Sequence, residues 1–424
     1  MSQTEARCEP LLPGLAEPQR QKLPNGVNVV ALPMAEAPVV CIDFWCRAGS
    51  VFESPGESGM AHFLEHMVFK GSERLEAGEF DRSIEALGGS SNAATGFDDV
   101  HYHVLIPPAA AGEAMDLLLD LVLTPRLEAE ALAMERQVVL EELAQSEDQP
   151  EEVALQRLLE RACPEHPYGL PILGRRPALQ RHDPAAMAAF HRRLYAADRC
   201  VLALGGAIDD SGLMQRAAEG PLAALDRAER LSDPPPLRME AGEEQLGLPR
   251  LEAARLLMAW TLPPARDLEA VMGADLATTL LAEGRRSRLV ERLRERLRIV
   301  ESIDLDLHAM EFGSLALLEA VCEPEELPQV RRSVTDVWEE VMAGPIEPGE
   351  WERSQRLVAN SYRFGLESAG AVAGLIGNSQ LWGRQHDLDR PLRLLELWDP
   401  SRLKREILGL LDPSRACVLE ALPA

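Results

Sequence analysis

The sequence HFLEH, residues 62–66, contains two histidines four positions apart, with a glutamate directly before the second one. On an α-helix, residues four apart lie on the same face, so His62 and His66 can reach a single ion. Imidazole nitrogen suits Zn²⁺, and Glu65 would lie beside the ion, where it could accept a proton from a bound water. The alternative is a buried helix whose histidines bond to backbone groups, and these five residues do not decide between the two.

A catalytic zinc site usually has a third protein ligand. The segment ERQVVLEE places Glu135 and Glu142 seven residues apart on a predicted helix, which returns them to almost the same helix face. Glu141 is adjacent but is expected on a different face. Because this region is rich in acidic residues, the pair alone still favours an ordinary solvated helix surface.

The flanking sequence predicts the elements that would position these residues. LPNGVNVVALP predicts a hairpin turn at Asn25-Gly26 followed by a strand, and VVCIDFWC, from Val39, predicts a second and strongly apolar strand. The mostly apolar residues around 61–68 then predict a buried helix. SNAATGFDDVHYHVLIP returns to strand-like alternation, and predicted helices follow before an apolar strand closes the block.

The same order of strand, helix, strands, helices and strand recurs in the second half of the chain. Between the two blocks, the pattern dissolves around residues 219–250, where Pro234-Pro235-Pro236 and charged flanks indicate a linker. We therefore predict an α+β protein with two similar domains, each a mostly antiparallel sheet covered by helices. The expected boundaries are an N-terminal zinc-binding domain at 18–220, a linker at 221–249 and a C-terminal domain at 250–424 without a metal site.

Composition limits the function classes. The 424-residue chain has a formal net charge of −26, which argues against nucleic acid and anionic membranes as partners. An acidic chamber that prefers basic peptides is compatible with this charge, as is a simple solvated surface. Seven scattered cysteines without a CxxC pair indicate neither a disulfide framework nor a cysteine zinc site. Without a signal-peptide pattern or an apolar run of ~20 residues, we expect a soluble cytoplasmic protein.

HFLEH together with ERQVVLEE resembles the pitrilysin-type inverzincin family of zinc metallopeptidases, and the size is closest to its processing-peptidase-like two-domain subunits. The segments GGSSNAATGFDDVHYHV, HPYGLPILG and FHRRLYAADRCVLALGG resemble further family segments in the family's order. The resemblance implies that His62, His66 and Glu142 bind one Zn²⁺. It also implies that Glu65 is the general base and that Glu135 supports the metal ligands.

The resemblance implies the activity of a zinc-dependent endopeptidase that hydrolyses peptides or unfolded segments inside a chamber. Glu65 would accept a proton from zinc-bound water and pass it to the leaving amine. Asn92 and Ala93 match the strand that pairs with the substrate backbone, a mode of binding that depends little on substrate sequence. Two alternatives remain, a processing peptidase that removes targeting segments and a non-catalytic scaffold subunit of the same fold.

One part of the family's substrate-binding pattern is missing. Family members use an arginine and, seven residues later, a tyrosine; here Arg294 fits the arginine, whereas Glu301 stands at the tyrosine position. An ionised carboxylate cannot donate a hydrogen bond to a developing oxyanion. We therefore expect a homologous partner subunit, in a heterodimer or homodimer, to complete the site. Arg294 and Glu301 could instead be ordinary surface charges.

His101 and His103 alternate on one predicted strand and would share one face. The sequence shows no acidic partner for them, so we assign them no metal.

Overall fold

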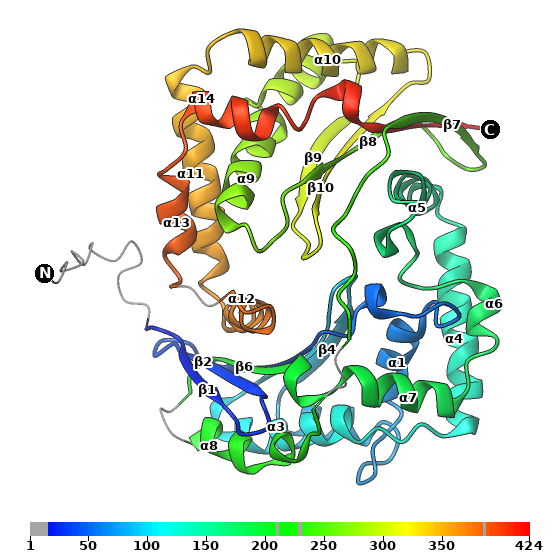
Figure 1. The fold of residues 1–424 in the computed structure, drawn as a ribbon, viewed down its shortest axis with the longest axis vertical. Coiled ribbons are helices and arrows are strands. Elements are labelled where there is room, and N and C mark those ends of the chain that lie inside the picture. Colours follow the sequence, from blue (N-terminus) through cyan, green and yellow to red (C-terminus); the bar gives the residue numbers. More distant parts are fainter. Residues whose placement is uncertain (1–15, 209–211, 228–230, 385–386) are drawn as a thin grey trace, which may run out of the picture.

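The computed structural model describes residues 16–208, 212–227, 231–384 and 387–424, and its elements form two halves that each contain one sheet (Figure 1). Among the described residues, no helix is long and apolar enough to cross a membrane. The elements of the first half are β1 (Gln19–Lys22), β2 (Asn28–Pro33), β3 (Val40–Cys46), α1 (Met60–Val68), α2 (Glu79–Ala86), β4 (Ser90–Thr95), β5 (Val100–Ile106), α3 (Ala111–Leu123), α4 (Ala129–Glu147), α5 (Pro150–Ala162), α6 (Arg176–Leu179), α7 (Pro184–Leu194), β6 (Cys200–Gly206) and α8 (Gly212–Glu219).

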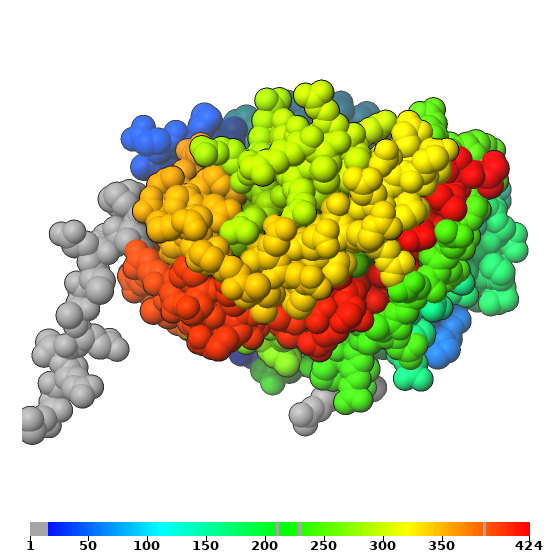
Figure 2. Space-filling view, turned by 90° about the horizontal axis from the view of Figure 1, so that it is seen from above, coloured from blue at the N-terminus to red at the C-terminus, as the bar shows by residue number. Residues whose placement is uncertain are grey.

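The second half contains one sheet and the C-terminal helices. Its elements are β7 (Gly242–Leu248), β8 (Ala254–Leu262), α9 (Leu268–Ala282), the π-helical turn η6 (Val290–Leu297), β9 (Ser302–His308), β10 (Ser314–Cys322), α10 (Leu327–Ala343), α11 (Pro348–Gly365), α12 (Ala369–Leu381), α13 (Arg390–Leu395), α14 (Pro400–Leu403) and β11 (Cys417–Pro423). Seen from above, these segments make up most of the visible face of the molecule (Figure 2).

The two sheets follow the same plan. The first has the order β1-β2-β6-β3-β5-β4 and the second β7-β11-β8-β10-β9. Each contains one parallel pair, β2 with β6 and β7 with β11, while the remaining pairs are antiparallel. The predicted fold class, two mostly antiparallel sheets covered by helices, is confirmed. In the first sheet β4 is an edge strand, which leaves one side of its backbone without a neighbouring strand in that sheet.

The second sheet begins inside the segment expected to be a linker. β7 lies within residues 221–249 and pairs in parallel with β11, so the sheet begins at Gly242, before the expected boundary at residue 250. Strand β7 reads GEEQLGL and alternates half-buried and exposed residues. Three of its seven residues are charged or amide residues, as is common in edge strands, so the sequence of β7 lacks the apolar run that predicts a strand.

Each half covers its sheet with a helix from the other half. α12 of the second half packs on the first sheet, where Val372 and Ile376 join the cluster around Trp45. α5 of the first half packs on the second sheet beside β8 and β11. Small residues permit the close approach of α12, because a Cβ added at Gly377 would lie only 2.6 Å from the Trp45 ring.

A buried carboxylate also joins the two halves. The Tyr168 hydroxyl donates to Asp98 Oδ1 at 2.6 Å, and the backbone N–H of Glu311 donates to Asp98 Oδ2 at 2.9 Å. The N–H of Phe312 donates in turn to the Tyr168 hydroxyl at 3.2 Å. Burial raises the pKa of Asp98 to about 7. These hydrogen bonds hold the turn between β4 and β5, which contains Asp98, against the second half.

Candidate metal centre

Helix α1 presents its apolar face to the core and its two histidines to α4. Phe63, Leu64 and Met67 are fully buried in the core of the first half. The helix begins after Gly59, which has a φ of 78°. A side chain there would also collide with the Leu173 carbonyl oxygen, 2.7 Å from the position of an added Cβ. Only glycine meets both conditions, so this residue sets where the HFLEH helix starts.

His62, His66 and Glu142 converge on one point. The His62 Nε2 atom lies 3.5 Å from Glu142 Oε1, and the His66 Nε2 atom lies 3.4 Å from Glu142 Oε2. In a tetrahedral zinc site with bonds of about 2.1 Å, neighbouring ligand atoms are about 3.4 Å apart. Each histidine therefore lies at about this distance from a Glu142 oxygen, one ligand atom from each of the three residues lies within 4.8 Å of the others, and the donor set of two imidazoles and one carboxylate fits zinc.

Glu135 holds the ring of His66 from behind. Its Oε1 atom lies 2.9 Å from His66 Nδ1, and its Oε2 atom lies 2.5 Å from Lys70 Nζ. Glu135 is 6% exposed. A carboxylate on Nδ1 leaves Nε2 free to bind a metal and fixes the direction in which it points.

The charges around the two histidines suit a cation. Burial, with the neighbouring His66, lowers the pKa of His62 to about 4, so its ring is neutral at pH 7, the form that binds metals. Burial alone would lower the pKa of His66, but Glu135, Glu142 and Glu65 together raise it above its ordinary value. A bound divalent ion would balance the negative charge of these three carboxylates.

Glu65 is tied to the edge strand by Thr95, a contact that the sequence analysis missed. The Thr95 hydroxyl donates a hydrogen bond to Glu65 Oε2. Burial raises the pKa of Glu65. Thr95 is the last residue of β4, on the same strand face as Ala93, so strand alternation could have directed attention to it. Lys70, also missed, follows His66 by four residues and lies in the turn just after the end of α1.

Asn92 and Ala93 lie in the middle of the edge strand β4. Asn92 is exposed, whereas Ala93 is half-buried and packs on the core. Asn92 Oδ1 accepts a hydrogen bond from the backbone N–H of Ala93 at 2.9 Å. An edge strand next to the metal candidates is compatible with backbone pairing to a peptide, and this role stays a prediction.

Arg294 and Glu301 are not joined to the metal candidates. Arg294 lies in η6 and donates to the adjacent Glu295 at 2.9 and 3.1 Å. Glu301 is exposed directly before β9, and its N–H donates to the Val321 carbonyl at 2.8 Å. In the part of the chain that the structure describes, no hydrogen bond or ion pair links either side chain to the three ligands. Their role in substrate binding stays a prediction.

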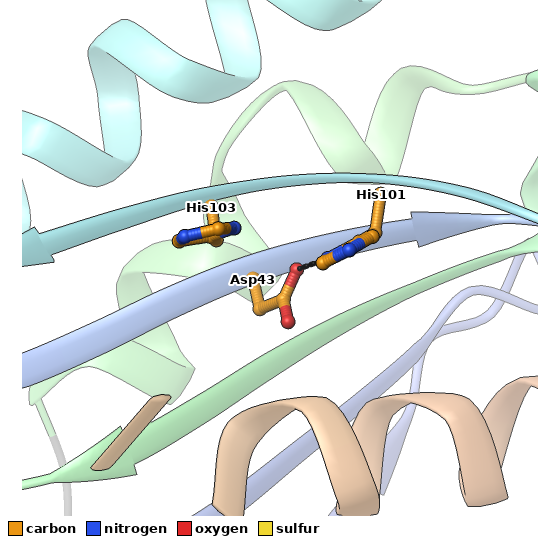
Figure 3. A group of neighbouring side chains, drawn as sticks. All are labelled: Asp43, His101 and His103. Carbon is orange, nitrogen blue, oxygen red and sulfur yellow. Dashed lines mark hydrogen bonds and ion pairs between the residues drawn. The ribbon is translucent and has the colours of Figure 1, made fainter. Parts of the chain in front are cut away.

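The expectation that His101 and His103 lack an acidic partner is wrong. Strands β3 and β5 pair in antiparallel register with Asp43 opposite His103, and Asp43 Oδ1 lies 3.0 Å from His101 Nδ1 (Figure 3). The partner belongs to a strand almost sixty residues earlier in the chain, so no local pattern shows it.

Comparisons with known proteins show the family of the chain. Residues 29–176 match the family model "Insulinase (Peptidase family M16)", and residues 183–358 match "Peptidase M16 inactive domain". An uncharacterized zinc protease of Mycobacterium tuberculosis is 30% identical over 389 residues, which cover 89% of this chain and 87% of that protein. A probable mitochondrial-processing peptidase subunit beta of Arabidopsis thaliana is 32% identical over 194 residues, 46% of this chain and 36% of that protein.

Solved structures share the whole fold. A protease from Helicobacter pylori has a TM-score of 0.87 at 22% identity, covering 96% of this chain and 99% of that one. A Pseudomonas fluorescens structure titled as an M16 inactive domain has a TM-score of 0.88 at 20% identity, covering 96% and 98%. The fold is therefore that of two-domain M16 proteins. The chain belongs to peptidase family M16, the insulinase or pitrilysin type, and the predicted family is confirmed.

Proposed function

We propose that this protein is a zinc-dependent endopeptidase that cleaves peptides or unfolded segments inside a chamber between homologous halves. The observation that carries the proposal is the convergence of His62, His66 and Glu142, whose ligand atoms lie within 4.8 Å of one another, with Glu135 fixing one ring. The relatives named as zinc proteases support the same chemistry. We assign one zinc ion to this catalytic site.

The roles of the residues follow from their positions. His62, His66 and Glu142 would hold the zinc ion, which supplies Lewis-acid activation of a water molecule and of the scissile carbonyl when it is bound. Glu65 precedes His66 and lies beside the ligands, where it takes the proton of the attacking water and returns it to the leaving amine. Thr95 keeps the Glu65 carboxylate in place. Backbone groups of β4 around Asn92 and Ala93 align an extended peptide next to these residues.

The test of the mechanism is Glu65→Gln in a chain that carries its metal. We expect a loss of cleavage of about 10²–10⁴-fold, the usual contribution of a general base, with zinc content unchanged. Glu141→Gln is the matched control, because Glu141 is the exposed neighbour of Glu142 on α4, and no hydrogen bond or ion pair among the described residues joins its side chain to the ligands. Cleavage by Glu65→Gln at the wild-type rate refutes the proposal.

We also propose that full activity needs a second subunit of similar fold. Glu301 cannot donate to an oxyanion while it is ionised, and Arg294 is engaged by Glu295. The partner would supply the missing donor across the chamber. The chain alone should then be a weak peptidase whose rate rises at least tenfold on assembly, measured together with mass by light scattering. Full activity in a preparation that light scattering shows to be monomeric would contradict the need for a second subunit.

A second candidate function is the removal of targeting segments. The similarity to a processing peptidase subunit over 46% of the chain favours it, and the acidic composition suits basic segments. Mass spectrometry of products distinguishes the two, because a processing enzyme gives one cut near the end of a segment. A general endopeptidase gives many cuts in an unfolded chain.

A further inference from the structure

A second group of metal-binding side chains lies on the first sheet. His101 and His103 alternate with Tyr102, which is fully buried in the core that contains α1 and α3. The two histidines therefore occupy the opposite face of the sheet, the face on which α12 packs. Asp43 stands opposite His103 on the neighbouring strand β3 and shares this face (Figure 3). Three potential ligands are thus placed by two adjacent strands of a rigid sheet.

The distances are those of a site that small side-chain rotations would close. Asp43 Oδ1 and His101 Nδ1 are 3.0 Å apart, and one ligand atom from each of the three residues lies within 4.8 Å of the others. Neighbouring ligands of tetrahedral zinc are about 3.4 Å apart. Asp43 is 2% exposed, so its carboxylate lies out of contact with bulk solvent.

One ring nitrogen in this group lacks a hydrogen-bond partner in the part of the chain that the structure describes. His103 Nδ1 is buried and has no hydrogen-bond partner among the described residues. Buried polar atoms are nearly always paired, so such an atom beside a second imidazole and a carboxylate points to a missing ligand.

The surroundings hold the rings and favour positive charge. Trp45 stacks on His101 with centroids 4.2 Å apart, and the rings of His101 and His103 stack at 5.5 Å. The residue of α12 that faces Asp43 Oδ2 is Gly374, where an added Cβ would lie 3.9 Å from this oxygen. Because glycine has no side chain, Gly374 does not cover the oxygen. The negative charges of Asp99 and Glu65 also favour a positive charge at His101.

We propose that Asp43, His101 and His103 form a second site for a divalent transition-metal ion, separate from the His62–His66–Glu142 site. Two imidazoles and one carboxylate are a ligand set for Zn²⁺ and its neighbours Co²⁺ and Ni²⁺, whereas Mg²⁺ and Ca²⁺ prefer oxygen ligands alone. Three protein ligands leave a further coordination position open. The site lies one strand from β4, on the face shared by Asn92 and Ala94, which pair with His103 and His101.

The test counts zinc ions per chain by equilibrium dialysis and elemental analysis of the full-length protein at saturating free zinc. We expect two ions in the wild type and one in His103→Ala. The control His308→Ala removes an exposed histidine of β9 and should keep two. The double variant His62→Ala/His66→Ala should keep one ion, which His103→Ala then removes.

The same series separates this proposal from the proposed peptidase function. If the wild type binds one ion that is lost in His62→Ala/His66→Ala and kept in His103→Ala, the second site is refuted while the first stands. Loss of the ion only in His103→Ala supports the second site and contradicts the first. Should His103→Ala fail to fold by circular dichroism, Asp43→Asn replaces it. Two ions retained in that folded variant also overturn the proposal.

Discussion

Removal of Glu135 should weaken zinc binding without removing a zinc ligand. In Glu135→Ala, His66 Nδ1 loses the carboxylate at 2.9 Å, and Lys70, which is one-third exposed, turns to solvent. A hydrogen bond to a charged group contributes about 1.5–3 kcal/mol. Such a loss corresponds to about 10–150-fold in the dissociation constant, and partners behind metal ligands typically contribute 10–100-fold.

The assay is competition for zinc between the protein and a coloured chelator at fixed pH. Glu130→Ala is the control, because Glu130 is exposed in the first turn of the same helix and should leave affinity within a factor of two. Lys70→Met should cost less than Glu135→Ala, because it keeps the carboxylate on His66. An affinity for zinc in Glu135→Ala equal to that of the wild type would show that Glu135 does not orient the ligand.

Three further predictions concern the general base, the packing of the halves and pH. Thr95→Val should lower kcat about tenfold with little change in KM, and Thr95→Ser should restore it; an effect on KM alone would contradict a positioning role. Gly377→Val in α12 should destabilise by about 1–3 kcal/mol in thermal unfolding, whereas Gly370→Ala, with nothing within 4 Å, should stabilise slightly. Burial, with Glu283, raises the pKa of Asp275 to about 6, so the folded state binds a proton that the unfolded state has released and stability falls as pH rises from about 4 to about 6. Asp275→Asn should flatten that fall; an unchanged pH profile would show that Asp275 is not its source.

The sequence predicted those features that depend on residues close together along the chain. The Asn25-Gly26 turn joins β1 and β2 as an antiparallel hairpin, and the apolar segment around HFLEH forms α1. The seven-residue spacing on α4 brings Glu135 and Glu142 to the same side of α1. In each case the information lies within a few turns or strand residues, where side-chain direction is set by backbone geometry.

Contacts between distant segments were beyond these patterns. Asp43 meets His101 only because β3 pairs with β5, and α12 crosses to the first sheet although it belongs to the second half. Strand register and helix exchange depend on the packing of whole faces, which a single sequence does not display. Thr95 and Lys70 could have been found by following strand and helix periodicity outward from the motif.

The most direct test of the zinc centre is X-ray absorption at the zinc edge on protein that carries one equivalent of zinc. We predict only nitrogen and oxygen neighbours at about 2.0–2.2 Å, with two imidazole rings, and a changed spectrum in His66→Ala and Glu142→Ala. Sulfur neighbours, or a spectrum identical in the wild type and both variants, would contradict the assignment of the zinc ion to His62, His66 and Glu142.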